Sequence, residues 1–541
     1  MPPPPSAIFQ WLFASDPAQA PRTLAARWLF LRALGLIFFS AFYSLVRQVN
    51  GLIGPDGLLP AQEYLQAIRR VAGASRFWDV PTVFWLRSDS RALLLVAWVG
   101  LIASILLVVN FWPRGMIFLC LVAYVSFISA LQTFSSYQSD GMLLSAGFIS
   151  LFFAPPGFWP RWGERHPGSR ASLFLLLVVW FTIYFESGVA KIASGDPEWR
   201  NLTAMDEYYQ NGPLPTWIGW YAHHLPHWFH LGTAAFTLAL ELVLVWVAVL
   251  PRRFRIALFW LVTPLQIGII ITSNYAFLNY LVLALGILLL DDKHLAVFLP
   301  RRLRGEAGRA TDKTAASISV MDQGVRHSSW AVLRGAFSSV GLWVAAFFQI
   351  WVFYAIAAQL IWMIVPQAPL PTSPVSSLEP YRIANRYGLF AVMTRGRYEI
   401  EFQGSNDGNT WTPYPFRYKP QDPRAAPGIY APYQPRFDWN LWFASLDNWQ
   451  QNRFVIYAEE KLLTGSPSVL SLFAGNPFSN PPPTQVRAVV WQYWFSDRAD
   501  KNQGSWWRRE FIGLYAPALE RQPDGKFVIT HFPEPGQRIR Q

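Results

Sequence analysis

Two charged residues, Glu186 and Lys191, lie within a long apolar stretch and are the first candidates for chemistry in this chain. An ionisable side chain at the centre of a membrane helix costs about 2.5 to 3.5 kcal/mol on insertion, so such residues generally serve a function or a partner. Their five-residue spacing places them roughly 140° apart around a helix, which makes them poor partners for each other. We therefore expect Lys191 to pair with Glu241 or Asp140, which lie in two other apolar stretches.

Three roles for Lys191 follow from this setting. A lysine near a helix end can extend its ammonium group to the membrane interface, while neighbouring carboxylates stabilise the packing. A lysine removed from water can instead lose its proton and act as a general base, with Glu186, Asp140 and Glu241 nearby. It can also bind a ligand. The residues favour the structural role and leave the other two open.

Four histidines fall within eight residues of an aromatic segment: His223, His224, His227 and His230. Imidazoles at this spacing can hold zinc. However, Pro226 interrupts any helix through them and no cysteine is near. Trp217, Trp220, Tyr221 and Trp228 surround these histidines, and Trp199 lies earlier in the same loop. Such residues are typical of a membrane interface. The pattern predicts an aromatic outer surface in which Trp199, Trp217, Trp220, Tyr221, His223 and His224 bind a client protein. It predicts neither a metal site nor a cofactor.

Two motifs near the C-terminus combine arginine with aromatic residues: A-P-Y-Q-P-R-F-D-W-N-L-W-F-A and W-W-R-R-E. They contain Tyr433, Arg436, Trp439, Trp442, Trp506, Trp507 and Arg508. One interpretation is structural, with ion pairs of Arg436 with Asp438 and of Arg508 or Arg509 with Glu510 stacked on aromatic rings. The other is an exposed, arginine-rimmed patch that binds a client.

The composition is that of a membrane protein. The 541 residues are 52% hydrophobic, 16% aromatic and 14% charged, whereas soluble domains average about 25% charged residues. The net charge of +12 comes from residues spread between apolar segments and along the C-terminal part, which argues against nucleic-acid binding and for membrane topology. The single cysteine, Cys120, excludes an intrachain disulfide.

Nine apolar runs are candidates for membrane-spanning helices, because each must cross about 30 Å of hydrocarbon. They lie near residues 28–47, 92–111, 116–134, 140–154, 171–192, 231–250, 256–274, 276–290 and 340–365. The fourth and eighth are short, so a count of seven or eight is also compatible.

Arginine and lysine residues suggest the orientation. With a cytoplasmic N-terminus, nine spans place the basic loops around Arg114, Arg165, Arg253 and Arg302 on one side. The loop from 48 to 90 departs from the rule, and its Y-L-Q-A-I-R-R-V-A run predicts a helix on the membrane surface. The resulting domains are an N-terminal cytoplasmic leader (1–27), a membrane domain (28–365) with an outer loop (194–230) and a cytoplasmic loop (291–335), a Pro-rich linker (366–379) and an extracytoplasmic domain (380–541).

The domain after the linker is expected to be rich in strands. R-Y-E-I-E-F-Q-G-S-N-D-G-N-T-W-T-P-Y alternates and turns at Asp407 and Gly408, which predicts a hairpin. F-V-I-Y-A and V-R-A-V-V-W-Q-Y-W-F predict further strands, with a helix at W-F-A-S-L-D-N-W. We predict a β-sandwich of jelly-roll type, and E-F-Q-G-S-N-D-G-N-T-W resembles the discoidin-type jelly roll.

Several longer motifs resemble the lipase maturation factor family. They are G-D-P-E-W-R-N-L-T-A-M, P-L-P-T-W-I-G-W-Y-A-H-H-L-P, S-N-Y-A-F-L-N, N-R-Y-G-L-F-A-V-M-T and K-P-Q-D-P-R, together with the two arginine motifs above. The resemblance implies a multi-span membrane protein whose outer face and C-terminal domain help lipases fold and assemble. The chain departs from the family pattern at Ser139 and Ser145, where Trp and Glu are expected. Its single cysteine and its length resemble bacterial members more than animal ones.

A second, more distant resemblance is to vitamin K-dependent gamma-carboxylase, through Gly188, Lys191, Asp196 and Trp199. It implies that Lys191 would occupy the position of the catalytic base. Two hypotheses therefore remain. The first is a membrane-bound folding and assembly factor for exported lipases or similar clients, without covalent chemistry, in contact with membrane lipid. The second is an intramembrane enzyme that acts on a lipid or a quinone-like molecule. The first places the protein in a bacterial inner membrane, or in the endoplasmic reticulum of a eukaryote.

Overall fold

The computed structural model describes residues 7–13, 23–298, 329–478 and 480–534. Most of the predicted leader and of the loop 291–335 therefore lies outside the described residues. The helices of the membrane part are α1 (Ala7–Phe13), α2 (Leu24–Ile53), α3 (Ala61–Val71), α4 (Arg76–Asp79), α5 (Ser90–Val108), α6 (Pro113–Ala130), α7 (Gln138–Phe153), α8 (Arg170–Ala193), α9 (Pro197–Arg200), α10 (Ala204–Asn211), α11 (Trp217–His223), α12 (His227–Leu242), α13 (Arg252–Thr272), α14 (Leu278–Gly286), α15 (Asp292–Leu295) and α17 (Ser329–Ile364).

Within the described part of the chain, six helices are long and apolar enough to cross a membrane: α2, α5, α6, α8, α13 and α17. The predicted count of nine is not confirmed. The runs at 140–154, 231–250 and 276–290 form α7 and α12, of 16 residues each, and α14, of nine. A 16-residue helix is about 24 Å long, which is less than the hydrocarbon thickness. After α12 and α14 the chain continues as short 3₁₀ helices, Leu244–Val249 and Ile287–Leu289.

The basic segments come together at one end of the helical part. The Arg27 guanidinium is buried and donates to the carbonyl oxygens of Phe153, Trp162, Gly163 and His166. The Asp292 carboxylate accepts the backbone N–H groups of Leu24 and Ala25 at the start of α2. The C-terminal domain contacts the opposite end, where Arg436 pairs with Asp140 in the first turn of α7.

The C-terminal part contains helices and one sheet. Its elements are α18 (Ser373–Ser376), β1 (Arg397–Ser405), β2 (Thr412–Pro413), α19 (Arg436–Ser445), α20 (Phe454–Leu463), α21 (Pro467–Leu470), β3 (Gln485–Phe495), α22 (Arg498–Asn502), β4 (Trp507–Leu514), β5 (Ala518–Arg521) and β6 (Phe527–His531). The strands are antiparallel in the order β2-β1-β3-β5-β6, and β4 also pairs with β3. The predicted hairpin at Asp407 and Gly408 and the long strand β3 are confirmed.

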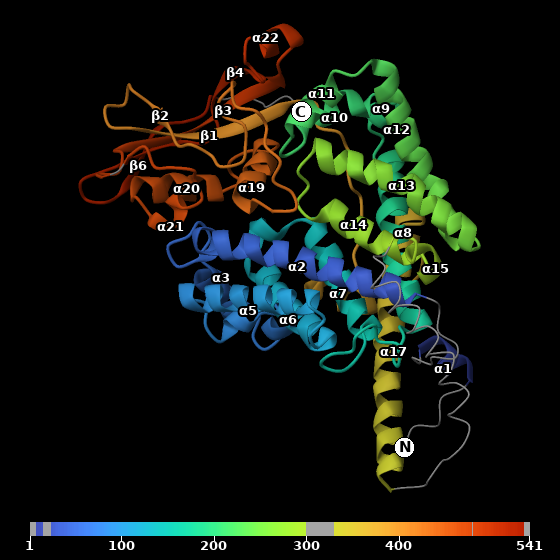
Figure 1. Ribbon diagram of the computed structural model, residues 1–541. Helices are drawn as coiled ribbons and strands as arrows, with labels where there is room; N and C mark the ends of the chain where they lie inside the picture. The colour runs from blue at the N-terminus through green and yellow to red at the C-terminus, as the bar shows by residue number, and fades with distance from the viewer. Residues whose placement is uncertain (1–6, 14–22, 299–328, 479, 535–541) are drawn as a thin grey trace.

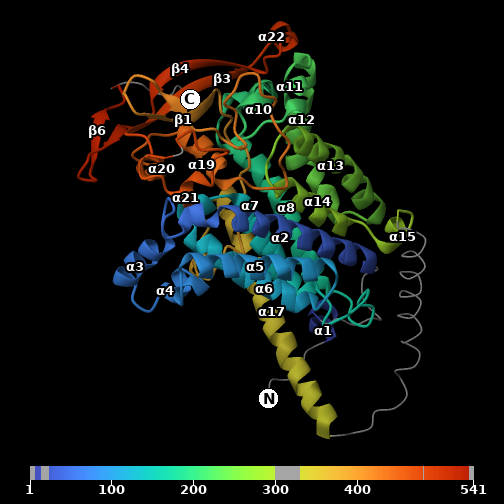
Figure 2. The same cartoon turned by 60° about the vertical axis from the view of Figure 1, so that its left-hand side comes forward.

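The predicted β-sandwich is not observed, because the described strands form a single sheet. The F-V-I-Y-A run is also not a strand. It begins α20, in which Val455, Ala458 and Leu462 recur at helical spacing and are fully buried. Figures 1 and 2 show α19, α20 and α21 between the sheet and the end of α2, where a sandwich would have its second sheet.

The helix α3 confirms the predicted helix in the loop from 48 to 90, and Arg69 and Arg70 are exposed in its last turn.

The membrane-spanning helices α13 and α17 expose long apolar faces. Only 17% of the apolar window of α13 and 28% of that of α17 are buried inside the protein. A soluble protein rarely exposes apolar surface of this extent, so these two helices fit contact with lipid.

Candidate functional site

Lys191 forms a buried ion pair near the end of α8. Its ammonium nitrogen lies 3.0 and 2.8 Å from the two carboxylate oxygens of Glu241 and 2.9 Å from the Leu389 carbonyl oxygen. It also lies 5.0 Å from the centre of the Trp199 ring. The pairing of Lys191 with Glu241 is therefore as predicted, whereas Asp140 has another partner.

This geometry does not support Lys191 as a base. An ammonium group has three hydrogens, and here three oxygen atoms accept them. The cavity beside Lys191 and Glu241 measures about 70 Å³. One water needs roughly 10 to 15 Å³ of such a cavity, so there is room for a few waters and not for a lipid or a quinone.

The last turns of α8 and the α9 turn hold the segment from Tyr387 to Thr394, called here the 387–394 segment. The Glu186 carboxylate accepts the Tyr387 N–H at 2.7 Å, and the Ser187 hydroxyl accepts the Leu389 N–H. Trp199 donates its indole N–H to the Phe390 carbonyl oxygen at 2.8 Å. Glu186, a candidate for catalysis, thus binds backbone from the C-terminal part.

Asp140 and Arg436 form an ion pair in which both side chains are 0% exposed. The two guanidinium nitrogens lie 2.8 and 2.9 Å from the two carboxylate oxygens, and Tyr124 donates its hydroxyl to Asp140 at 2.6 Å. The predicted pairing of Arg436 with Asp438 is wrong. Side chains two positions apart on a helix do not face each other, and both residues lie in the first turn of α19.

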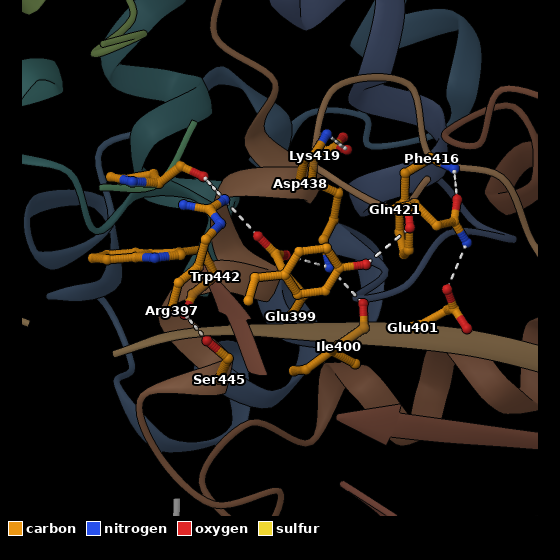
Figure 3. Close-up of polar contacts among 12 residues, drawn as sticks. Arg397, Glu399, Ile400, Glu401, Phe416, Lys419, Gln421, Asp438, Trp442 and Ser445 are labelled. Atoms are coloured by element: carbon orange, nitrogen blue, oxygen red, sulfur yellow. Dashed lines mark hydrogen bonds and ion pairs between the residues drawn. The ribbon is translucent and has the colours of Figure 1, made fainter. Parts of the chain in front are cut away.

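A second buried charge network joins the outer loop to the sheet (Figure 3). Glu399 on β1 pairs with Arg397 and, at 2.8 Å, with Lys419. Arg397 also donates to the carbonyl oxygens of Gln210 and Pro213, at 2.9 and 3.0 Å, and to that of Gly212. The loop after α10 is therefore fixed by a guanidinium group of the sheet.

Asp438 lies beside this network, with its carboxylate accepting the Lys419 N–H at 3.3 Å. Complete burial raises the pKa of Asp438 to about 7, although the Lys419 ammonium group opposes the shift.

The charge network of Arg397, Glu399 and Lys419 was not identified from the sequence. The only signal was the alternation R-Y-E-I-E, and charges on a strand more often mark a solvated face.

The thirteen residues predicted to bind a client divide by exposure. Six are buried and cannot touch a docked protein without rearrangement: Trp199, Trp220, Arg436, Trp439, Trp442 and Trp507. His223, His224, Tyr433 and Trp506 are half-buried, and Trp217, Tyr221 and Arg508 are exposed. The sequence could not separate these groups, because tryptophan occurs both in protein cores and at interfaces.

The exposed members gather where α11 approaches the start of β4. Trp217 and Tyr221 are 43% and 53% exposed, and the Tyr221 and Trp506 rings lie 6.5 Å apart. Lys501 lies 3.8 Å above the Trp506 ring. Arg508 pairs with Asp497 and Asp500, and Arg509 lies 3.5 Å from Glu401, so neither arginine pairs with Glu510 as predicted. We call Trp217, Tyr221, Lys501, Trp506 and Arg508 the α11–β4 surface.

Neighbouring groups bind three of the four histidines separately. His224 contacts the Trp220 carbonyl oxygen, His227 the Asp206 carboxylate and His230 the Leu225 carbonyl oxygen. Burial lowers the pKa of His223 to about 4. In the described part of the chain, no three His, Cys, Asp or Glu side chains come together as metal ligands would.

Comparison with known proteins agrees with the two-part structure. The family model of the lipase maturation factor transmembrane domain matches residues 25–297, and that of the lipase maturation factor C-terminal domain matches residues 383–517. The chain is 32% identical to lipase maturation factor 1 of Bos taurus, over 94% of this chain and 91% of that protein. It is 32% identical to lipase maturation factor 2 of Homo sapiens, over 91% of this chain and 82% of that protein.

No solved structure matches the chain. The two family models cover the helical part and the sheet-containing part in the order in which the structure has them, and the relatives align over nearly the whole length. The chain therefore belongs to the lipase maturation factor family.

Proposed function

We propose that this protein is a membrane-bound maturation factor that helps an exported lipase, or a similar client, to fold and assemble. The α11–β4 surface would hold the client through aromatic and basic side chains. Trp, Tyr and Arg are the residues that most often dominate binding energy at protein interfaces. No observation favours the alternative of an intramembrane enzyme, because Lys191 is fully engaged and its cavity is small.

The observation that carries this proposal is the rigid attachment of an exposed aromatic surface. The Trp220 indole N–H donates to the Ser496 carbonyl oxygen at 3.0 Å, and the Trp217 N–H donates to the Pro427 carbonyl oxygen at 3.0 Å. Both bonds fix α11 to the C-terminal domain. A surface held in place loses little conformational entropy when it binds, which favours affinity.

The orientation belongs to the same proposal. The α11–β4 surface and the whole C-terminal domain would face the outside of a bacterial inner membrane, or the lumen of the endoplasmic reticulum in a eukaryote. Newly exported lipases fold in those compartments, so the surface would meet them there. The helices α13 and α17, with their exposed apolar faces, would contact membrane lipid.

The test is co-expression of the full chain with a secreted triacylglycerol lipase. The double variant Trp217→Ala/Tyr221→Ala should lower the secreted lipase activity several-fold at unchanged levels of both proteins, since a truncated interface hot spot costs about 2 kcal/mol or more. Trp228→Ala is the matched control, because Trp228 is 72% exposed on α12 but lies outside the surface. Full lipase activity with the double variant would exclude this surface as the client site.

A further inference from the structure

A larger cavity, of about 490 Å³, lies where the membrane part meets the C-terminal domain. Its walls come from the start of α7, the end of α10, the Tyr275 turn, the 387–394 segment and α19. Tyr208, Leu278, Leu389 and Phe390 line both this cavity and the small one beside Lys191, so they form the wall between the two. None of the residues of the α11–β4 surface lines it.

The lining excludes a charged ligand. The apolar wall is mostly aromatic, with Tyr137, Phe390, Trp439, Trp442 and Phe443. No Asp, Glu, Lys, Arg or His is among the described residues that line the cavity. A carboxylate or phosphate placed there would lose its hydration without gaining a counter-charge, at a large cost in free energy.

Apart from the hydroxyls of Tyr208 and Tyr275, which interact with each other, three polar atoms in the wall have no hydrogen-bond partner in the protein. They are the Ser139 hydroxyl, the Asn211 side-chain oxygen and the Trp439 indole N–H. Their residues are only 1%, 2% and 5% exposed. Buried polar atoms nearly always have a partner, so three unpaired atoms in one wall indicate that something else binds them.

The orientation of Asn211 is determined by its other contacts. Its amide nitrogen donates to the Glu207 carboxylate at 2.9 Å and to the Thr394 carbonyl oxygen at 2.7 Å. A flipped amide would place its oxygen against these two acceptors, so the oxygen must remain the unpaired atom. The wall therefore offers one acceptor at Asn211, one donor at Trp439 and a hydroxyl at Ser139 that can do either.

We propose that this cavity binds one uncharged, single-chain lipid that carries hydroxyl and carbonyl groups at one end, as a monoacylglycerol does. The Trp439 N–H would donate to the carbonyl oxygen, and the Asn211 oxygen would accept a ligand hydroxyl, with Ser139 as a third contact. The acyl chain would lie against the aromatic and aliphatic wall. A volume of about 490 Å³ lies within the usual range of small-molecule sites, about 300 to 1,000 Å³.

Such a lipid would touch both parts of the protein. Ser139 and Asn211 belong to α7 and α10 of the membrane part, whereas Trp439 belongs to α19 of the C-terminal domain. The ligand would therefore stabilise the docking of one part on the other. This inference does not depend on the client or on the α11–β4 surface.

The experiment uses the purified full-length protein in phosphatidylcholine nanodiscs. Titration with 1-oleoylglycerol should raise the midpoint of thermal unfolding and change the tryptophan fluorescence. Oleate, which has the same chain and a negative charge, should do neither. An equal response to 1-oleoylglycerol and oleate, or no response to 1-oleoylglycerol, would overturn the proposal. The cavity would then hold only water.

Two variants test the location. Trp439→Phe removes the indole N–H and should weaken binding about 3- to 10-fold, as expected for one lost hydrogen bond. Trp228→Phe is the matched control, because Trp228 does not line the cavity, and this variant should bind as the unmodified protein does. Ser139→Trp should fill the cavity and abolish the response, and if that variant does not fold, Trp439→Phe still decides. Unchanged affinity in Trp439→Phe would exclude the proposed contact.

Discussion

Arg436, in the C-terminal domain, forms a buried ion pair with Asp140 of the membrane part. Removing one partner of a buried ion pair leaves the other charge unpaired, which typically costs about 3 to 5 kcal/mol. We expect Arg436→Met to lower the free energy of unfolding by that amount, measured by thermal or denaturant unfolding of the protein in detergent. The matched control is Arg508→Met, because Arg508 is 55% exposed in its ion pairs and solvent-exposed pairs contribute little to stability. Similar losses in the two variants would contradict this account.

Asp438 should make the stability depend on pH near neutrality. Its pKa is about 7 in the folded protein and about 3.9 in an unfolded chain. The folded protein therefore holds a proton that the unfolded chain releases, and this stabilises folding most at low pH. The contribution is fully present below about pH 4 and is lost as the pH rises through 7.

Asp438→Asn tests this directly, because an amide resembles the protonated carboxyl and does not titrate. Between pH 5 and pH 8 the unfolding midpoint of the unmodified protein should fall relative to that of the variant. Parallel pH profiles of the two proteins would show that Asp438 does not keep its proton. The test compares the unfolding midpoints of the two proteins at each pH, so the contributions of other titrating groups, which both proteins share, cancel.

Among the elements, α2 packs tightly against α5 at Gly100. A methyl group added there would lie 2.2 to 2.5 Å from ring carbons of Phe42, which is fully buried and packs against Tyr124. Small residues allow membrane helices to approach in this way. Gly100→Ala should therefore destabilise the protein by about 1 to 3 kcal/mol, the usual cost of overpacking.

The control for this helix contact is Gly268→Ala on α13, where an added methyl group meets nothing within 4 Å. That variant should be neutral or slightly more stable, because alanine favours a helix more than glycine does. Unfolding in detergent measures both. If the two substitutions have the same effect, the close packing of α2 on α5 does not limit stability.

How much of these elements the sequence predicts depends on the range of the interaction. Hydrophobic length identified α2, α5, α6, α8, α13 and α17. Alternation identified β1 and β3, and both patterns are local. The run F-V-I-Y-A looks like a strand by itself, and only its continuation to Leu462 shows the helical spacing of α20. The partners Asp140 and Arg436 are separated by 296 residues, so no local pattern could pair them. The pairing of Lys191 with Glu241 was predictable because a buried charge requires a counter-charge and few were available.

At the scale of the whole molecule, the two parts share one hydrophobic core, and polar contacts add a defined orientation to it. The Asn274 side chain accepts the N–H groups of Tyr430 and Ala431 and donates to the Gly428 carbonyl oxygen at 2.9 Å. Gln48 on α2 donates to the Gln434 carbonyl oxygen and the Tyr433 hydroxyl, both at 2.9 Å. Because such bonds require defined geometry, they hold the domain in one orientation at one end of the helices.

The single cysteine makes this arrangement testable on the full chain. Cys120 is buried, and Cys120→Ala gives a background without thiols. Asp524→Cys, in the exposed turn between β5 and β6, and Arg165→Cys, in the exposed loop after α7, then place one thiol at each end. In bacterial spheroplasts a membrane-impermeant maleimide should label Asp524→Cys directly and Arg165→Cys only after permeabilisation, because positively charged loops remain in the cytoplasm. The reverse pattern would invert the proposed orientation, and direct labelling of both would contradict the placement of the two ends on opposite sides.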